Sequence, residues 1–189
     1  IQFGGRPVDL ALSPDGQTVY IKNMRNLVVV DAAGWQVRQT LAYPGNGASM
    51  HGVAVSPDGT HVYVTGASNE LYDWTVAHNG VVTFARTIAL PGGSYPCGLA
   101  LSRDGSQAYV CLSVANKLAV VNLANGTVTR QINVGIAPWD VVVSPDGNTA
   151  YVSDWGGRFP TAGDLTAPSA GTPVIVDDRG VAASGALSV

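Results

Sequence analysis

The pentapeptide Leu-Ser-Pro-Asp-Gly at residues 12–16 decides the fold, because the chain repeats it three more times with small changes. The later copies occupy residues 55–59, 101–105 and 143–147. Their aspartates, at positions 15, 58, 104 and 146, recur every 42 to 46 residues. A period of this length is typical of small sheets repeated around an axis. The sequence therefore predicts a radial, all-β architecture.

Each copy of the pentapeptide predicts a β-hairpin. Proline presets the first central turn position, aspartate accepts hydrogen bonds from nearby backbone amides, and glycine takes the left-handed conformation. Beyond each turn, a second strand carries a tyrosine beside apolar residues, at Tyr20, Tyr63, Tyr109 and Tyr151. Third and fourth strands follow, for example at residues 118–121 and 127–134. Four antiparallel strands in about 40 residues form one propeller blade.

The predicted fold is an all-β propeller of four-stranded antiparallel blades, with three complete blades and most of a fourth. The blades cover about residues 1–43, 44–91, 92–134 and 135–189, and the fourth contains an insertion at about 155–185. Because the chain starts in one strand and stops within another, we expect a fragment of a seven-bladed ring. The alternative is a partial propeller that another chain completes.

The composition agrees with many short strands joined by tight turns. Charged residues make up 12% of the chain and hydrophobic residues 46%, and there are 23 glycines and 11 prolines. A net charge of -3 provides no basic footprint for nucleic acid or for an anionic membrane. The longest apolar runs are shorter than a membrane span. We therefore expect neither a nucleic-acid partner nor a membrane span.

The repeats resemble a known family. The pattern Gly-x-x-Pro, a short apolar stretch, Ser-Pro-Asp-Gly and then an apolar residue, tyrosine and another apolar residue recurs at residues 5–21, 47–65, 93–110 and 135–153. The departures are modest: Met50 replaces the first proline in the second repeat, and Arg103 replaces the turn proline in the third. It resembles the YVTN-repeat propellers, and Tyr-Val-Thr-Gly at residues 63–66 is most similar to the tetrapeptide that names them. The resemblance implies the fold. It implies no single activity, because binding modules, surface proteins and several enzyme classes share this repeat.

The insertion is the most individual part of the chain. Residues 155–185 are too apolar for a solvated linker, and residues 173–177 are expected to form a short added strand. The series Ser-Asp-Trp-Gly-Gly-Arg at residues 153–158 resembles a loop of bacterial proteins that join a YVTN propeller to a C-terminal phosphoesterase. This resemblance implies an exported protein, periplasmic or extracellular, with a catalytic domain beyond Val189.

A candidate binding site lies on the rim opposite the Ser-Pro-Asp-Gly turns. Loops that lead into the first strand of each blade meet there, around the mouth of the central channel. The candidate residues for binding a protein or small-molecule ligand are Arg6, His51, Tyr95, Trp139, Asp140, Asp154, Trp155 and Arg158. The alternative interpretation is structural: Trp139 packs between blades and Asp140 bonds to strand amides.

No catalytic residue, metal ligand or cofactor is predicted. The three histidines lack metal-ligand spacing, and no Gly-x-Ser-x-Gly elbow occurs. The favoured function is a non-catalytic scaffold or binding module. Its expected partners are a ligand at the rim and the remaining blades, from the same polypeptide or another chain. The alternative is a lactonase of the phosphogluconolactone type, to which residues 71–84 are faintly similar, although Glu70 is the only glutamate.

The two cysteines, Cys97 and Cys111, are candidates for a disulfide. A hairpin that pairs Ser102 with Gln107 places them nearly opposite each other on neighbouring strands, within reach of a bridge. A bridge would fit an exported protein, and two buried thiols would be equally ordinary for strand residues.

Overall fold

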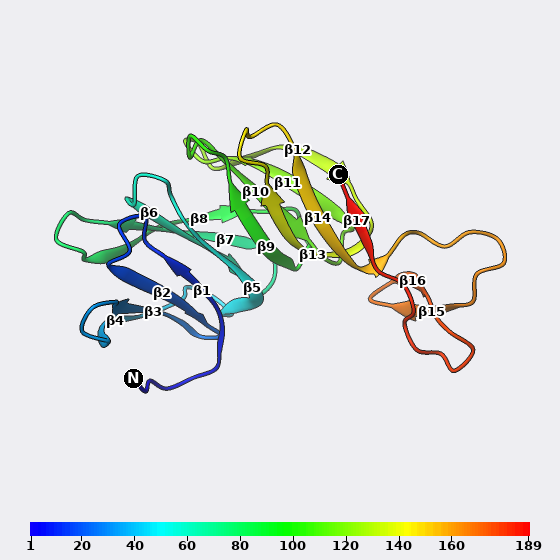
Figure 1. Cartoon of the computed structure of the whole chain (residues 1–189), viewed down its shortest axis with the longest axis horizontal. Helices are drawn as coiled ribbons and strands as arrows, with labels where there is room; N and C mark the ends of the chain where they lie inside the picture. Colours follow the sequence, from blue (N-terminus) through cyan, green and yellow to red (C-terminus); the bar gives the residue numbers. More distant parts are fainter.

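The computed structural model describes residues 1–189, in which four antiparallel β-sheets form the blades and a separate two-stranded hairpin lies in the insertion (Figure 1). The first sheet contains β1 (Pro7–Leu12), β2 (Thr18–Asn23), β3 (Asn26–Asp31) and β4 (Gln36–Ala42). The second contains β5 (Ala48–Val55), β6 (His61–Gly66), β7 (Glu70–Val76) and β8 (Val82–Ala89). The third contains β9 (Pro96–Leu101), β10 (Gln107–Leu112), β11 (Lys117–Asn122) and β12 (Thr127–Asn133).

The fourth sheet has three strands, β13 (Ile136–Val143), β14 (Ala150–Gly157) and β17 (Ala186–Ser188). Its third strand begins at Ala186, after an insertion that carries the hairpin of β15 (Thr166–Ser169) and β16 (Thr172–Ile175). The strand expected at residues 173–177 overlaps β16. Three four-stranded blades and a three-stranded fourth confirm the predicted fold class.

The four sheets form an arc, with the first and fourth sheets at its two ends (Figure 1). Along the inside of the arc, β1 packs beside β5, β5 beside β9, and β9 beside β13. The insertion extends away from the sheets beside the fourth blade (Figure 1). Its one side-chain hydrogen bond to the third blade runs from Asn116 Nδ2 to Thr172 Oγ1, at 2.9 Å. No helix in the structure has the length and apolarity needed to cross a membrane.

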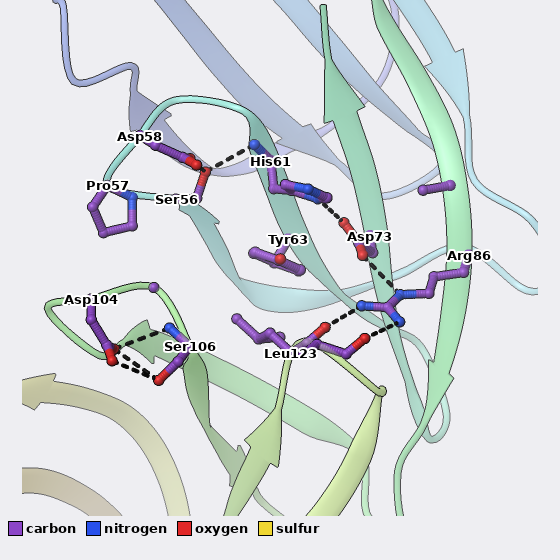
Figure 2. Close-up of a pocket in the computed structure, with 13 residues that line it drawn as sticks. Ser56, Pro57, Asp58, His61, Tyr63, Asp73, Arg86, Asp104, Ser106 and Leu123 are labelled. Carbon is purple, nitrogen blue, oxygen red and sulfur yellow. Dashed lines mark hydrogen bonds and ion pairs between the residues drawn. The ribbon is translucent and has the colours of Figure 1, made fainter.

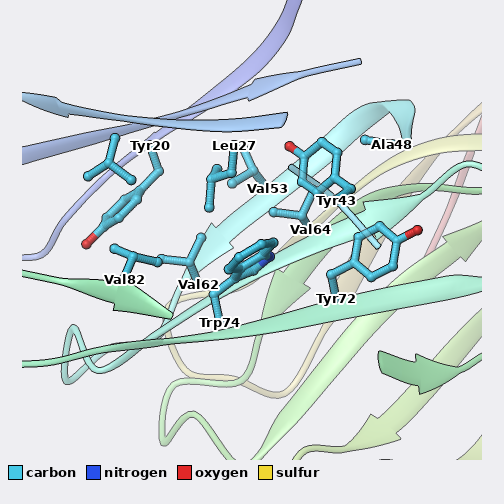
Figure 3. Close-up of a cluster of buried hydrophobic side chains, with 11 residues drawn as sticks. Tyr20, Leu27, Tyr43, Ala48, Val53, Val62, Val64, Tyr72, Trp74 and Val82 are labelled. Atoms are coloured by element: carbon cyan, nitrogen blue, oxygen red, sulfur yellow. The ribbon is translucent and has the colours of Figure 1, made fainter. Parts of the chain in front are cut away.

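Apolar side chains between successive sheets form the core. Between the first and second blades, Tyr20 and Leu27 pack in the same cluster as Val62, Val64 and Trp74 (Figure 3). Two further clusters occupy the next two interfaces. Residues 27–30 of β3 are fully buried, because a middle strand of a blade is covered on both faces. This explains its uninterrupted run of Leu and Val.

The Ser-Pro-Asp-Gly turns adopt the predicted hairpin chemistry. In the second blade, Ser56 Oγ donates to Asp58 Oδ1 at 2.6 Å, and the Thr60 amide donates to the same oxygen at 3.0 Å. These hydrogen bonds, with that from Ser56 the largest, lower the pKa of Asp58 to about 2. The turn glycine, Gly59, has a φ of 73°. The turns are therefore stabilised by residues within the pentapeptide and the one after it.

One sequence expectation about the inner strands is wrong. Alignment of the repeats predicts that Val8, His51, Cys97 and Trp139 stand just before the first strand of their blades, but all four lie inside strands, namely β1, β5, β9 and β13. The difference arises because these strands contain irregular pairing before the regular ladder begins, as between Ala48 and Val53 of β5. A bulge leaves residues unpaired without ending the strand.

Candidate functional site

His51 lies between two carboxylates from other blades. Its Nδ1 is 3.0 Å from Asp9 Oδ2 of β1, and its Nε2 is 3.1 Å from Asp140 Oδ1 of β13. Both ring nitrogens must donate to satisfy these partners, so the arrangement favours the imidazolium. The hydrogen bond with Asp140, followed by that with Asp9, raises the pKa of His51 to about 9. The first, second and fourth blades are thus joined by one cation.

The two carboxyl groups respond to this cation in the expected direction. The hydrogen bond from His51 lowers the pKa of Asp140. Burial pushes the pKa of Asp9 upward, but hydrogen bonds from His51 and from the Gly52 amide leave it below its ordinary value. Asp9 Oδ2 accepts the Gly52 amide at 2.8 Å. Ion pairing and backbone hydrogen bonding therefore share the same carboxylate.

Glycines occupy the positions aligned with these aspartates in the middle blades, and in both the close neighbours leave no room for a side chain. A Cβ on Gly98 would lie 2.5 Å from Asp140 Oδ1. Gly52 has a φ of +103°, and its Cβ would lie 2.1 Å from the carbonyl oxygen of Cys97. The Asp140 carboxylate also accepts the Val141 amide at 2.8 Å. The structural interpretation of Asp140 is consistent with this contact, so packing accounts for part of the cluster.

Lys22 is the member of this cluster that sequence reasoning missed. It is fully buried, and its Nζ donates to the His51 carbonyl at 2.5 Å, to Thr65 Oγ1 at 2.7 Å and to Ser49 Oγ at 3.0 Å. Burial lowers its pKa to about 7. Alignment of the repeats could have identified Lys22, because the other three blades have a small side chain at the equivalent position, namely Thr65, Cys111 and Ser153.

Two tryptophans extend the cluster toward solvent. The Trp139 ring lies parallel to that of His51, with the ring centroids 5.7 Å apart. Trp155 meets Trp139 edge to face at 5.0 Å, and 71% of Trp155 is exposed. A cationic imidazole against an indole face is a favourable cation–π arrangement. The charge cluster thus leads directly into an exposed aromatic surface.

A pocket of about 1060 Å³, here called the tryptophan pocket, lies at this surface. It is lined by Trp139, Ser153, Asp154, Trp155 and residues 182–187. Asp154 is 2% exposed; its Oδ2 accepts a hydrogen bond from Ser188 Oγ at 2.6 Å, whereas its Oδ1 has no partner. Burial raises the pKa of Asp154. Ser184 Oγ, in the same lining, is also buried without a partner.

The structure brings together five of the eight predicted rim residues: His51, Trp139, Asp140, Asp154 and Trp155. The other three lie apart from this group. Arg158 forms two hydrogen bonds of 2.9 Å with Asp164 inside the insertion. Arg6 and Tyr95 are exposed, and neither lines the tryptophan pocket. A binding role for any of the eight stays a prediction.

Cys97 and Cys111 are free, buried thiols in the structure, so the bridge considered from the sequence is not formed there. The ladder pairs Val110 with Leu99 and Leu112 with Pro96, and an irregularity separates these two pairs. Cys111 therefore lies in the irregular part of the ladder and is not directly paired with Cys97. Burial raises the pKa of both thiols.

A second pocket, of about 520 Å³, lies beside the Ser-Pro-Asp-Gly turn of the second blade and the Ser-Arg-Asp-Gly turn of the third (Figure 2). Buried Asp73 bonds His61 Nδ1 at 2.7 Å and Arg86 Nε at 2.9 Å. Arg86 also donates to the carbonyl of Leu123 in the third blade. Asp73, His61 and Arg86 therefore link the second blade to the third. The first and third blades have a buried valine at the position of Asp73, so this carboxylate is particular to the second blade.

No group of three or more His, Cys, Asp or Glu side chains is arranged to hold a metal ion. Glu70, the only glutamate, accepts the backbone amides of Ser68 and Asn69, both at 3.1 Å. It therefore closes a local turn.

Four-stranded antiparallel sheets that pack side by side, with the first strand of each on the inside of the arc, define the class of β-propellers. A model of the YNCE-like beta-propeller family matches residues 27–147, and the chain belongs to this family. It is 30% identical, over 131 residues, to the seven-bladed beta-propeller protein Rv1057 of Mycobacterium tuberculosis. That match covers 68% of this chain and 32% of the relative. The narrower resemblance to YVTN-repeat proteins stays a prediction.

Two solved structures are also similar. Hydrazine synthase of Kuenenia stuttgartiensis matches with a TM-score of 0.70 and 26% identity, covering 88% of this chain and 46% of that one. A functionally unknown protein from Desulfotomaculum acetoxidans matches with a TM-score of 0.72 and 20% identity, covering 94% and 57%. The chain therefore spans about a third of the curated relative and about half of each structure.

Proposed function

We propose that this propeller is a non-catalytic binding module, and that its tryptophan pocket receives a small-molecule ligand or a segment of a partner protein. The observation that carries the proposal is Trp155, which is 71% exposed beside Trp139 in the pocket lining. Covering an exposed indole removes apolar surface from water and is favourable, and an unpaired buried carboxylate oxygen raises the free energy of the folded protein. A ligand that covers Trp155 and bonds to Asp154 would lower the free energy in both ways.

We further propose that the four blades belong to a seven-bladed ring completed by the same polypeptide or by another chain. The relative from Mycobacterium tuberculosis is described as seven-bladed. In addition, Leu10 and Leu12 are exposed on the first sheet, and Val142 is exposed on the fourth. Their neighbours Ala11 and Val141 pack between blades, so by strand alternation the exposed residues point away from the arc. Further blades would cover these apolar faces.

Export to the periplasm or the cell exterior, and a phosphoesterase domain after the propeller, complete the proposal. Both rest on the resemblance of residues 153–158 to the loop of such bacterial proteins. The full reading frame and the fraction of the cell that contains its product test them directly. For the lactonase alternative, Glu70 is engaged in its local turn, and no observation of the structure favours that activity.

A thermal-shift screen with a panel of metabolites and peptides tests the binding module. We expect at least one compound to raise the unfolding temperature of the natural protein but not of Trp155→Ala. Trp35→Ala is the matched control, because Trp35 is 61% exposed but lies in the first blade, between β3 and β4. The proposal fails if no compound stabilises the natural protein, or if every stabilising compound acts equally on Trp155→Ala.

A further inference from the structure

The fourth blade carries a charge that its geometry does not require. Asp154 pairs with Pro138, as Asn23 pairs with Pro7 in the first blade, so the two side chains are equivalent. Each has a buried Oδ1 without a partner. The unpaired oxygen is thus common to both blades, whereas the negative charge is specific to the fourth. An unpaired buried carboxylate costs more than an unpaired amide oxygen, which is why burial raises the pKa of Asp154, and a donor cation at Oδ1 would stabilise its ionised form.

The amide at the equivalent position shows what the carboxylate cannot do. Asn23 Nδ2 donates to the Gly4 carbonyl and to Asn26 Oδ1, both at 2.9 Å. Asp154 has no such donor; its carboxyl group accepts a hydrogen bond from Ser188 Oγ, and the backbone amides of Gly135 and Ser188 also act to lower its pKa. Nearby, Ser184 Oγ also lacks a partner. The polar part of the tryptophan pocket therefore offers acceptors for a ligand that brings N–H or O–H donors.

The charges around the pocket favour a cation over a neutral donor. His51 is already matched by Asp9 and Asp140. Arg158, which follows Trp155 closely in sequence, is matched by Asp164. Asp154 is the one ionisable residue in the pocket lining, so the pocket itself presents a carboxyl group and no cation. Indole faces attract a cation as well, and two indoles line the pocket.

We propose that the tryptophan pocket binds the primary ammonium group of a small organic amine. This rests on the proposed function, that the pocket receives a ligand. The N–H groups donate to Asp154 Oδ1 and Ser184 Oγ, and the charge lies against the tryptophans. A quaternary ammonium satisfies only the tryptophans, because it has no N–H to donate. The pocket volume of about 1060 Å³ leaves room for the rest of an amine.

Access to Asp154 requires a local movement of the pocket wall, because the residue is 2% exposed. Residues 182–185 are the lining residues that belong to none of the named strands. They are held by few backbone contacts, including the bridge of Val176 with Ala182 and the bond from the Ala183 amide to the Ile175 carbonyl. The carboxyl group of Asp154 lies against Gly135 and Ser188, and residues 182–185 form the adjoining wall of the pocket, whose displacement would open the pocket toward it.

Tryptophan fluorescence and calorimetric titration of the purified chain test the proposal. The probes are n-butylammonium, tetramethylammonium, 1-butanol and methyl β-glucoside. We expect n-butylammonium to bind at least about tenfold more tightly than the other three. Asp154→Asn should lower its affinity about tenfold to hundredfold, the loss expected for a hydrogen bond to a charged group. Asparagine is the natural residue at the equivalent position, so the variant should fold.

Asp146→Asn is the matched control, because it removes the same charge from a turn on the opposite rim. It should leave n-butylammonium affinity unchanged, and Trp155→Phe should retain more affinity than Trp155→Ala. If 1-butanol or the glucoside binds best in a Trp155-dependent manner, the ammonium proposal is overturned and the binding module stands. If n-butylammonium does not bind, or binds equally to Asp154→Asn, the ammonium proposal is also overturned. The metabolite screen with Trp155→Ala decides the binding module separately.

Discussion

Replacing His51 with glutamine should destabilise the protein most below pH 6.5 and progressively less as the pH rises to about 9. Glutamine can still form hydrogen bonds, but it has no charge. It therefore removes the ion pairs to Asp9 and Asp140 while it leaves both aspartates in place. The pH dependence of the loss separates the charge from any change in packing against Trp139.

The magnitude follows from the shift of the His51 pKa, from 6.5 to about 9. Below 6.5 the imidazole is protonated in both the folded and unfolded states, so the ion pairs stabilise the fold fully. Between 6.5 and about 9 the unfolded state loses its proton first, and the stabilisation declines by about 1.4 kcal/mol per pH unit. Because 22% of the His51 side chain is exposed, we expect solvent screening to reduce the total to about 2 to 3 kcal/mol.

Urea unfolding of the natural protein and His51→Gln, from about pH 6 to about pH 10, measures this difference. Taking the difference between the two proteins cancels titrations that they share. His78→Gln is the control, since His78 is an exposed histidine near a turn of the second blade. A gap between the natural protein and His51→Gln that stays constant across this pH range would refute the reasoning.

Three further predictions concern buried groups. Lys22→Met should show the opposite pH dependence to His51→Gln, because burial lowers the pKa of Lys22 from 10.5 to about 7. Over that pH range the free energy of unfolding of the natural protein should rise by about 1.4 kcal/mol per pH unit relative to the variant, measured by urea unfolding. Gly52→Ala should lower the free energy of unfolding by about 3 kcal/mol or more, since the φ of Gly52 is +103° and the new Cβ would meet the Cys97 carbonyl. Gly16→Ala is the control: with a φ of +71° and open space around it, it should lower the free energy of unfolding by only about 1 to 2 kcal/mol. Equal losses of stability on thermal unfolding would contradict this prediction. Cys97 and Cys111 should both react with a thiol reagent only after denaturation, and fewer than two reactive thiols in denaturant without reductant would indicate a bridge.

Most of the fold was predictable because its signals are local. The turn at Asp58 is stabilised by Ser56 and Thr60, which are neighbours in sequence. The insertion was predictable for the complementary reason, since it interrupts a repeat of known length. The starts of the inner strands were predicted less well. Irregular pairing before Val53 gives no pattern that alternation in the sequence reveals.

The candidate site was predictable only in part. Aligning the repeats identified His51, Trp139 and Asp140, because the inner strand of every blade faces the same axis. It did not identify the partner of His51 in the first blade, nor the role of Lys22. Those contacts depend on how far side chains reach across blade interfaces, which no periodicity in the sequence encodes.

The sequence by itself determined the blade, because turn chemistry and strand alternation depend on residues within one repeat. Only the tertiary structure showed which contacts are made by the residues that differ between repeats. Only the stacking of blades places Asp9 and Asp140 on opposite nitrogens of His51, and Trp155 against Trp139. The physical reason is distance: local backbone rules act between neighbours in the chain, whereas these charges and rings meet only after separate sheets have packed.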